Sequence, residues 1–237
     1  MHTGRSRYRT HGGIPNGSTN ALAGNLSFWL QNNVGVAVGQ WDDQSSNARH
    51  ATQGTSGDQA ALAEGGLDFE TSEGDHYDFD SQVAITAEEG FTIFVVCNLE
   101  SSGSNACLLG LNATTHFLEF QGGADNMRMK LGTTLSTISP GEGTNNDFAT
   151  GSKMLIAIQR EAGGTGNINL YKNGVILAQD SQAANTGDGE FITLGTRDGD
   201  RFLDGIIHEI LMVETGKDTT AVRDRIPGYL GGKHGLA

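Results

Sequence analysis

The amino-acid sequence predicts an all-β protein in which two antiparallel sheets pack as a sandwich, with one short helix near the C-terminus. Three observations indicate this fold class: many glycines, many short apolar runs, and an Asn-Gly pair between two such runs. Glycine accounts for 35 of the 237 residues and proline for only 3, a balance typical of proteins with many tight turns. A chain of this length fits a single sandwich domain.

Short strand-like runs recur along the chain with turn residues between them. These runs are Val34–Val38, Leu67–Phe69, Tyr77–Phe79, Phe91–Leu99, Ala106–Leu111, His116–Phe120, Met127–Leu131, Met154–Gln159, Ile168–Tyr171, Val175–Ala178, Phe191–Leu194 and Ile206–Val213.

Two kinds of apolar pattern distinguish the expected strands. Val34–Val38 and Tyr77–Asp80 alternate, which predicts strands with one apolar and one polar face. Phe91–Val96 is apolar on both sides, as expected of a central strand in a packed sandwich. Asn173 and Gly174 lie between two apolar runs and supply the positive φ angles of a type I′ hairpin turn.

The expected helix lies near the C-terminus. Its apolar face is formed by residues at helical spacing, namely Val222, Ile226, Tyr229 and Leu230. Thr219 is expected to cap the N-terminus of the helix. Pro227 is expected to shorten or kink it, and Gly231-Gly232 to end it.

Residues 1–25 are predicted to form an arm before the domain, which begins at residue 26. The segment is polar, rich in glycine and aperiodic, so it cannot bury enough apolar surface to fold alone. It carries Arg5, Arg7 and Arg9, and no acidic residue occurs before Asp42. The whole chain has a net charge of −13, which argues against general nucleic-acid binding by the domain surface.

The two cysteines are Cys97 and Cys107. They lie in successive apolar runs, so we expect them on adjacent strands of one hairpin. A disulfide between them and two buried free thiols are both compatible with that position. Free thiols are favoured, because unpaired cysteine behaves as a small hydrophobic side chain.

Several classes of function have no support in the sequence. No apolar run approaches the ~18 residues of a transmembrane helix, and the N-terminal residues lack the apolar segment of a secretory signal. The chain has no helical His-x-x-x-His pair for zinc, no phosphate-binding loop, no dinucleotide fingerprint and no Gly-x-Ser-x-Gly elbow.

Six segments, in order, resemble those of a known family. They are Trp41–Gln53, Leu67–Tyr77, Phe91–Val96, Leu170–Gly174, Phe202–Leu211 and Ile226–Leu236. The sequence is similar to the LamG-like jelly-roll domains of the concanavalin A-like superfamily, in the form common in bacterial and phage proteins. The resemblance implies a jelly-roll domain over residues 26–237. Ser46, Pro227 and His234 replace a usual Gly, Glu and Trp, and Val222 stands where a capping-box Glu is usual.

The resemblance also raises glycoside hydrolysis, because some concanavalin A-like proteins are glycosidases. Catalysis needs two carboxylates beside the scissile bond, about 5–5.5 Å apart in retaining enzymes. The nearest match is Glu73–Asp78. Gly74 and Asp75 fit a turn, however, and the last acid is the short Asp78. We therefore expect solvated turn carboxylates here and assign no catalytic residue.

Calcium is the cofactor that the resemblance allows, since concanavalin A-like folds often hold Ca²⁺ through oxygen ligands. The candidate loop residues are Asp42, Asp43, Asn47, Asp75, Asp198 and Asp200. The spacing of Asp43, Ser45 and Asn47 equally suits an Asx turn, in which side chains bind their own backbone. The turn is favoured, and no metal ligand is assigned.

Sugar binding would need an exposed aromatic platform with amide or carboxylate groups beside it. The chain has only 2 Trp and 4 Tyr. Trp29 and Trp41 are expected in the core, which leaves Tyr77, Phe148 and Phe202 as weak candidates.

Three functions follow, of which the first is a non-catalytic docking protein anchored by its arm. Arg5, Arg7, Tyr8 and Arg9 suit a partner that offers carboxylates or phosphates. The family resemblance adds the expectation of a phage virion component, a capsid decoration or tail-associated protein. It would assemble in several copies on a capsid or tail protein in the host cytoplasm. The alternatives are an extracellular lectin-like module that binds a cell-surface glycan, and a glycoside hydrolase.

Overall fold

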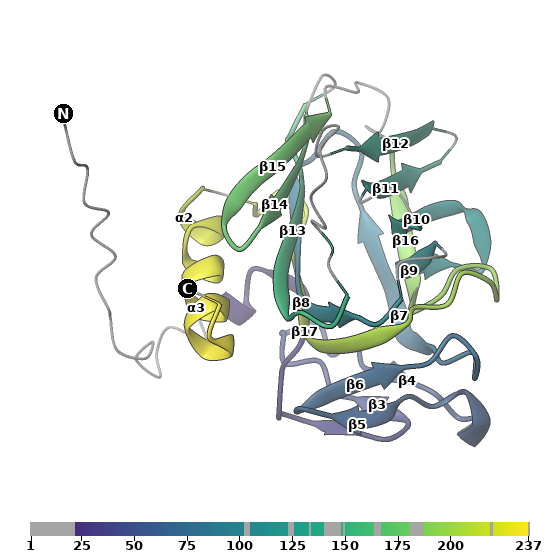
Figure 1. The fold of residues 1–237 in the computed structure, drawn as a ribbon. Helices are drawn as coiled ribbons and strands as arrows, with labels where there is room; N and C mark the ends of the chain where they lie inside the picture. The colour runs from purple at the N-terminus through teal and green to yellow at the C-terminus, as the bar shows by residue number, and fades with distance from the viewer. Residues whose placement is uncertain are drawn as a thin grey trace.

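The computed structural model describes residues 22–101, 105–122, 126–132, 134–139, 148, 150–163, 167–180, 187–218 and 220–236. They form two antiparallel sheets packed face to face, with helical segments against the outer side of one sheet (Figure 1). The predicted all-β sandwich is thus confirmed. Arg5, Arg7, Tyr8 and Arg9 lie outside the described residues, so the docking arm stays a prediction.

The first sheet, sheet A, contains eight strands. Their order is β15 (Val175–Asp180), β14 (Ile168–Lys172), β13 (Met154–Arg160), β8 (Phe91–Leu99), β17 (Gly205–Val213), β6 (Gly66–Phe69) and β5 (Ala61–Ala63). The eighth strand, β1 (Leu26–Leu30), pairs with the second half of β17, whereas β6 pairs with its first half. β1 and β6 thus share one edge of β17, and β8 pairs along the other edge.

The second sheet, sheet B, contains nine strands. Their order is β12 (Thr134–Ile138), β11 (Asn126–Leu131), β10 (Ala113–Gln121), β9 (Ala106–Leu111), β16 (Gly189–Leu194), β7 (Tyr77–Ile85), β4 (Ala51–Thr52), β3 (Gln40–Trp41) and β2 (Val36–Ala37). A short 3₁₀ turn, Ser56–Asp58, lies between β4 and β5.

The main core lies between the sheets, and β8 shows how the sequence builds it. Its inward side chains are all buried there: Phe91, Ile93, Val95, Cys97 and Leu99. Its outward Phe94 and Val96 are also buried, in a second apolar cluster on the outer face of sheet A. The strand is apolar on both sides, as predicted, because both of its faces are buried. Each large apolar side chain that is buried stabilises the fold by about 1.5–3 kcal/mol.

Two helical segments, α2 (Thr220–Arg223) and α3 (Arg225–His234), cover that second cluster. Ile226 and Leu230 of α3 are buried beside Trp29, Phe94 and Leu211. Helical spacing brings Ile226 and Leu230 to one face of α3, so the predicted apolar face is the one that docks.

The ends of this helix differ from the sequence prediction. The helix is interrupted at Asp224, between α2 and α3. Pro227 lies in the first turn of α3, where a backbone N–H would have no acceptor within the helix, so the lack of one in proline costs no hydrogen bond. The prediction that Gly231-Gly232 ends the helix was wrong. The helix continues to His234 and ends at Gly235, whose φ is 71°, because packing of the last turn overrides the low helix propensity of glycine. Thr219, the predicted cap, lies outside the described residues.

Most predicted strands form, but Val34–Val38 does not form as expected. Only Val36–Ala37 is a strand, and Val34 and Val38 are 37% and 53% exposed. Positive φ at Gly35 and Gly39 turns this segment into a tight loop at the edge of sheet B. The alternation at Tyr77–Asp80 is confirmed, with aromatic rings buried and carboxylates exposed. Strands β3, β4, β5 and β12 carried no apolar signal strong enough to predict them.

The cysteines are correctly predicted as buried free thiols, but their placement was wrong. Cys97 lies in β8 of sheet A and Cys107 in β9 of sheet B, because the chain crosses between the sheets after β8. Burial raises the pKa of the Cys97 thiol to about 12 and raises that of Cys107 as well.

The Asn-Gly turn between β14 and β15 is confirmed, with φ of 49° at Asn173 and 79° at Gly174. Within the described part of the chain, no helix is long and apolar enough to span a membrane.

Candidate functional site

The Asp42–Asn47 loop lies between β3 and β4, and Asp43 pairs with Leu30 at the end of β1. Both carboxylate oxygens of Asp43 accept protein donors: the backbone N–H groups of Trp29 at 2.7 Å, Ser45 at 2.8 Å and Arg49 at 2.8 Å, and the Ser45 hydroxyl at 2.7 Å. Asp43 is only 7% exposed. The hydrogen bond from the Ser45 N–H is that of the Asx-turn interpretation, whereas the one from the Trp29 N–H ties β1 to this loop.

The other two calcium candidates of this loop also bind protein groups. Asn47 donates its side-chain amide to the carbonyl oxygens of Leu26 at 2.7 Å and Ser27 at 3.2 Å. Asp42 accepts the amide of Gln40 at 2.6 Å and lies 3.4 Å from His50 Nδ1. Calcium binding at this loop stays a prediction.

The expected solvated turn at Asp75 was wrong in one respect. Asp75 does follow a turn, but its side chain is only 1% exposed, and it accepts the Glu70 N–H at 2.8 Å. Glu73 and Asp78 are exposed. Burial is the largest cause that raises the pKa of Asp75. Because Asp75 is buried while the other two face solvent, these three carboxylates do not line one groove.

The predicted aromatic candidates are mostly core residues. Tyr77 has no exposed surface, and its hydroxyl contacts the Gly39 N–H at 3.3 Å and the Ala60 carbonyl at 3.4 Å, so it is wrong as a sugar platform. Phe148 is also buried. Phe202 is half-buried, with its ring centroid 6.0 Å from that of His76. The expectation that Trp29 and Trp41 are core residues is confirmed.

Asp198 and Asp200 belong to a tight turn between β16 and β17. Positive φ of 55° at Asp198 and 62° at Gly199 shapes the turn, and Arg197 and Asp200 pair through their backbones. The Asp200 carboxylate lies 3.3 Å from Arg201 Nε. The two acids thus lie between Arg197 and Arg201, which are their neighbours in the sequence.

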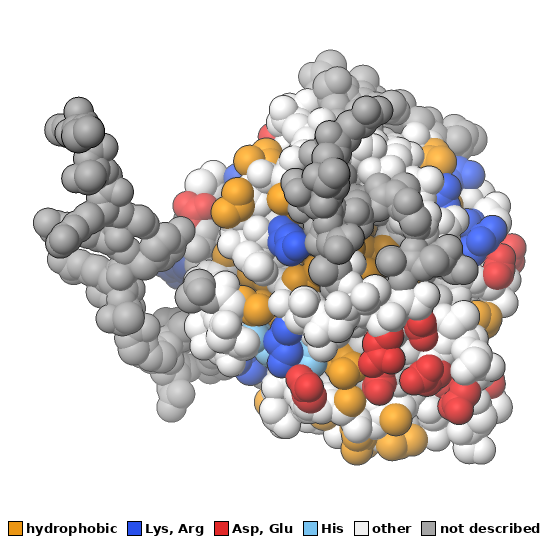
Figure 2. Space-filling model, in the orientation of Figure 1, with side chains coloured by type: hydrophobic (Ala, Val, Ile, Leu, Met, Phe, Trp, Pro, Cys, Tyr) orange, Lys and Arg blue, Asp and Glu red, His pale blue; other side chains and the backbone are white. Residues whose placement is uncertain are grey.

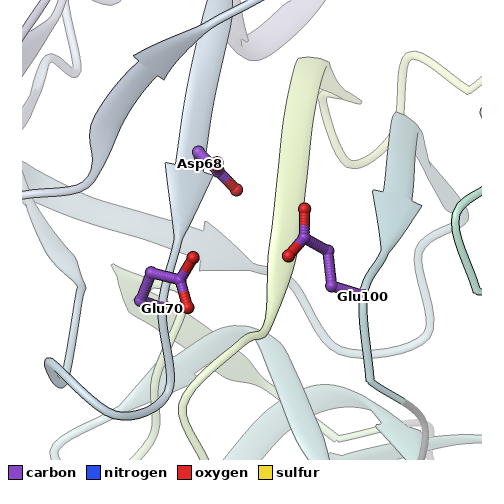
Figure 3. A group of neighbouring side chains, drawn as sticks. All are labelled: Asp68, Glu70 and Glu100. Atoms are coloured by element: carbon purple, nitrogen blue, oxygen red, sulfur yellow. The ribbon is translucent and has the colours of Figure 1, made fainter.

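Within the described ranges, one group of carboxylates is close enough to share a cation. The ligand oxygens of Asp68, Glu70 and Glu100 all lie within 4.8 Å of one another. Figure 3 shows Asp68 and Glu70 on one side of β17 and Glu100 on the other, with their carboxylates turned toward each other. Burial, followed by the charges of neighbouring acids, raises the pKa of Asp68 and Glu70.

An oxygen-only group of this kind suits Ca²⁺ chemically, but none of the six predicted calcium residues belongs to it. The sequence places the three acids in or just after apolar runs. Their meeting depends on β17 pairing with both β6 and β8, which no local pattern shows.

A buried glutamate anchors α3 to the outer face of sheet A. Glu209 has no exposed surface and accepts Trp29 Nε1 at 2.7 Å, Lys233 Nζ at 2.8 Å and His234 Nε2 at 2.9 Å. Burial opposes ionisation of Glu209, but the hydrogen bond from His234 and the charge of Lys233 outweigh it and hold its pKa below the usual value.

A second buried glutamate lies on the outer face of sheet B. Glu119 of β10 has no exposed surface; its Oε2 accepts Arg197 Nε at 2.8 Å, and its Oε1 accepts the guanidinium of Arg128 on β11. The Arg197 guanidinium lies 4.2 Å from the centroid of the Phe117 ring. Figure 2 shows Lys and Arg side chains gathered toward the right margin of the view, above a group of Asp and Glu side chains.

A shallow hollow of about 360 Å³ lies where β7, β10 and β16 meet. Its polar lining includes Gln82, Thr86, His116, Asp188 and Glu190. His116 Nδ1 accepts the Glu190 N–H at 3.3 Å, and Asp188 accepts the N–H of residue 87 at 2.7 Å. These contacts leave the Gln82 amide and the Glu190 carboxylate as hydrogen-bonding groups at the hollow.

No family model and no curated protein matches the sequence, but solved structures resemble the fold. Domain 4 of AbnA, a GH43 extracellular arabinanase from Geobacillus stearothermophilus solved in complex with arabinotriose, matches with a TM-score of 0.60 and 14% identity. The match covers 84% of this chain and 97% of that domain. The ligand-binding domain of botulinum neurotoxin serotype D, in complex with N-acetylneuraminic acid, has a TM-score of 0.60 and 12% identity, over 89% of this chain and 52% of that one.

A GH54 α-L-arabinofuranosidase also matches, with a TM-score of 0.53 and 14% identity, over 87% of this chain and 59% of that one. The chain thus spans about half the length of the toxin domain. At these identities the matches show the fold alone: a two-sheet sandwich shared with carbohydrate-binding domains. The LamG-like resemblance and the virion role stay predictions, and nothing in these matches supports the virion role.

Proposed function

We propose that this protein is a non-catalytic carbohydrate-binding sandwich domain, the lectin-like alternative of the sequence analysis. The observation that carries the proposal is the likeness to domain 4 of AbnA, which extends over 84% of this chain and 97% of that domain. A domain that can be superposed almost from end to end, and that was solved with a bound oligosaccharide, supports a sugar-binding role for the same architecture here.

The hollow between β7, β10 and β16 is where we expect a saccharide to bind. Its volume of about 360 Å³ lies in the usual range of small-molecule sites, about 300–1,000 Å³. Gln82 and Glu190 offer an amide and a carboxylate, which donate to and accept from sugar hydroxyls. The buried position of Asp75, away from Glu73 and Asp78, supports a binding role over glycoside hydrolysis.

The test is a panel of neutral and charged oligosaccharides, titrated by isothermal calorimetry against the wild type and the double variant Gln82→Ala/Glu190→Gln. We expect at least one saccharide to bind, and the double variant to weaken it about tenfold, because each lost hydrogen bond is worth about 0.5–1.5 kcal/mol. Asp78→Asn, a matched loss of one exposed carboxylate on β7, should leave the affinity unchanged.

Two outcomes would contradict the proposal. If no saccharide on the panel binds at millimolar concentration, the protein is not a carbohydrate-binding domain. If a bound oligosaccharide is cleaved during incubation, as seen by the release of reducing ends, the protein is a hydrolase. If a saccharide binds the double variant as tightly as the wild type, the binding site does not lie at the hollow.

A further inference from the structure

The outer face of sheet B carries more positive charge than its buried carboxylate can neutralise. Arg128 and Arg197 both donate to Glu119, so two cations share one anion. Glu119 has no exposed side-chain surface, whereas the side chains of Arg128 and Arg197 are 17% and 12% exposed. The carboxylate is therefore sealed from solvent, whereas part of each arginine side chain reaches it.

A third arginine adds to this charge. Arg201 follows the Asp198–Asp200 turn, and its side chain is 42% exposed. The Arg201 carbonyl oxygen accepts the Cys107 N–H at 2.8 Å, and Cys107 pairs with Glu119 across β9 and β10, so Arg201 lies beside the carboxylate that the other two arginines share. Burial first, and then the charges of Arg197 and Arg201, lower the pKa of Arg128. Asp200 lies 3.3 Å from Arg201, but the pair is exposed, and an exposed ion pair is weak.

The fold holds these groups in place before any ligand arrives. Arg197 stacks on Phe117 at 4.2 Å and crosses β9 at Gly110. A Cβ at Gly110 would lie 2.3 Å from the Thr196 carbonyl oxygen and 2.8 Å from Arg197 Cβ. Only glycine leaves room for this arginine to reach β10, so the position of the cation is built into the sheet.

The guanidinium groups also have hydrogen-bond donors to spare. Each guanidinium has five N–H groups in a fixed planar fork, and Arg128 and Arg197 each bind Glu119 through one nitrogen. Arg128 Nε is buried, with no hydrogen-bond partner among the described residues, so the donors available to a ligand are at the guanidinium ends. Carboxylate and sulfate groups match such a fork with paired hydrogen bonds and also neutralise its charge, which a neutral sugar hydroxyl does not do.

We propose that Arg128, Arg197 and Arg201 form a binding site for the acidic group of an anionic saccharide, a carboxylate- or sulfate-bearing glycan. The inference rests on the proposed function in taking a saccharide as the ligand, and it adds a second contact site apart from the hollow. The chain has a net charge of −13, so the rest of the surface repels such a ligand and this face selects where it binds.

The experiment compares four probes by isothermal calorimetry at 50 and 300 mM NaCl. They are an oligogalacturonate for the carboxylate, a heparin-derived tetrasaccharide for the sulfate, neutral arabinotriose, and inorganic sulfate alone. The full chain is used as wild type and as Arg201→Gln, a substitution at a side chain exposed enough to leave folding intact. Lys217→Gln is the matched control, because Lys217 also pairs with an acid on the surface but lies beyond the end of β17.

We expect at least one anionic saccharide to bind more tightly than inorganic sulfate, and to lose several-fold in affinity at the higher salt concentration. Arg201→Gln should weaken this binding at least threefold, and Lys217→Gln should not change it. Comparison of the affinities for the oligogalacturonate and the heparin-derived tetrasaccharide then distinguishes a carboxylate ligand from a sulfate ligand.

The proposal is overturned if neither anionic saccharide binds, if inorganic sulfate binds as tightly as the sulfated saccharide, or if both variants weaken binding equally. Neutral arabinotriose binding without either anionic probe would overturn this site and leave the carbohydrate-binding function standing. If no saccharide of any kind binds, both proposals are wrong.

Discussion

Each sheet of the sandwich carries a fully buried glutamate on its outer face, and the two are used differently. Glu209 on sheet A is bound by Trp29 of β1 and by Lys233 and His234 of α3. Glu119 on sheet B is bound by arginines from β11 and from the turn after β16. In the first case the chain brings its own helix and seals the face.

In the second case no described helix covers the face, and the cationic partners stay at the surface. A buried carboxylate is costly unless cations and donors surround it. The cations around Glu209 belong to a helix that covers the sheet face. The cations around Glu119 stay at the surface of the sheet. Sheet A therefore has a structural outer face, and sheet B has the outer face that we propose binds a ligand.

The largest effect should come from Glu209→Ala. This change leaves the Trp29 indole without its acceptor and Lys233 and His234 without their counter-charge, so we expect a loss of about 4 kcal/mol in the free energy of unfolding. Urea unfolding followed by tryptophan fluorescence measures it. Glu214→Ala, which breaks an exposed pair with Lys217, should cost less than about 1 kcal/mol. If the two substitutions lowered the free energy of unfolding equally, the structural role of Glu209 would be contradicted.

Glu119→Ala should cost slightly less, about 3 kcal/mol, because the arginines left unpaired can reach water. The same urea titration measures the loss. Arg128 and Arg197 would then repel each other without an anion between them, so added sulfate should restore more stability to this variant than to Glu209→Ala. Equal restoration in both variants would show that the two glutamates are not distinguished by access to solvent.

Acidification should weaken the sheet A side through His208, which has no exposed surface. Burial first, and then the charge of Lys153, lower the pKa of His208 to about 4 from 6.5. The unfolded chain takes up a proton below pH 6.5 while the folded one resists until about pH 4, so stability falls through this window by about 2–3 kcal/mol.

Because the pKa of Glu209 is lowered in the folded protein, acidification also reduces the free energy of unfolding through this group. This loss occurs at lower pH, below the ordinary pKa of glutamate. Urea unfolding at pH 7, 6, 5 and 4 measures the His208 effect, and further titrations below pH 4 measure that of Glu209. His208→Gln should flatten the curve between pH 6.5 and 4. An unchanged slope in this variant would mean that another group causes the loss.

The smallest effect should come from Phe117→Leu, which keeps an apolar side chain beneath Arg197 but removes the aromatic face. A cation–π contact of this kind is worth about 0.5–2 kcal/mol, so we expect a loss of about 1 kcal/mol in unfolding free energy. Binding of an anionic saccharide should weaken as well, because Arg197 is then held less firmly. Weaker folding with unchanged binding would leave Phe117 a purely structural role.

Much of the fold could be predicted because burial leaves a local pattern in a strand. Phe91–Leu99 is apolar on both sides and lies at the centre of sheet A. Asn173-Gly174 forms the turn that its φ requirements predict. Asp43 accepts the Ser45 N–H, the local hydrogen bond that the Asx pattern indicated. In each case, neighbours in the sequence settle the conformation.

The candidate sites could not be predicted in the same way. Glu119 and Arg197 are 78 positions apart, and Trp29 and Glu209 are 180 apart. Asp75 shows the same limit, since its turn was predicted but its burial was not.

The sequence by itself determined most of the segments that become strands, which of their side chains are apolar enough to bury, and where the Asn173-Gly174 turn lies. Only the tertiary structure decided that β17 pairs with both β6 and β8, and that the turn after β16 carries Arg197 across Gly110 to Glu119. The physical reason is that alternation and turn chemistry act within a few residues, whereas charge pairs on a sheet face depend on the order in which distant strands meet.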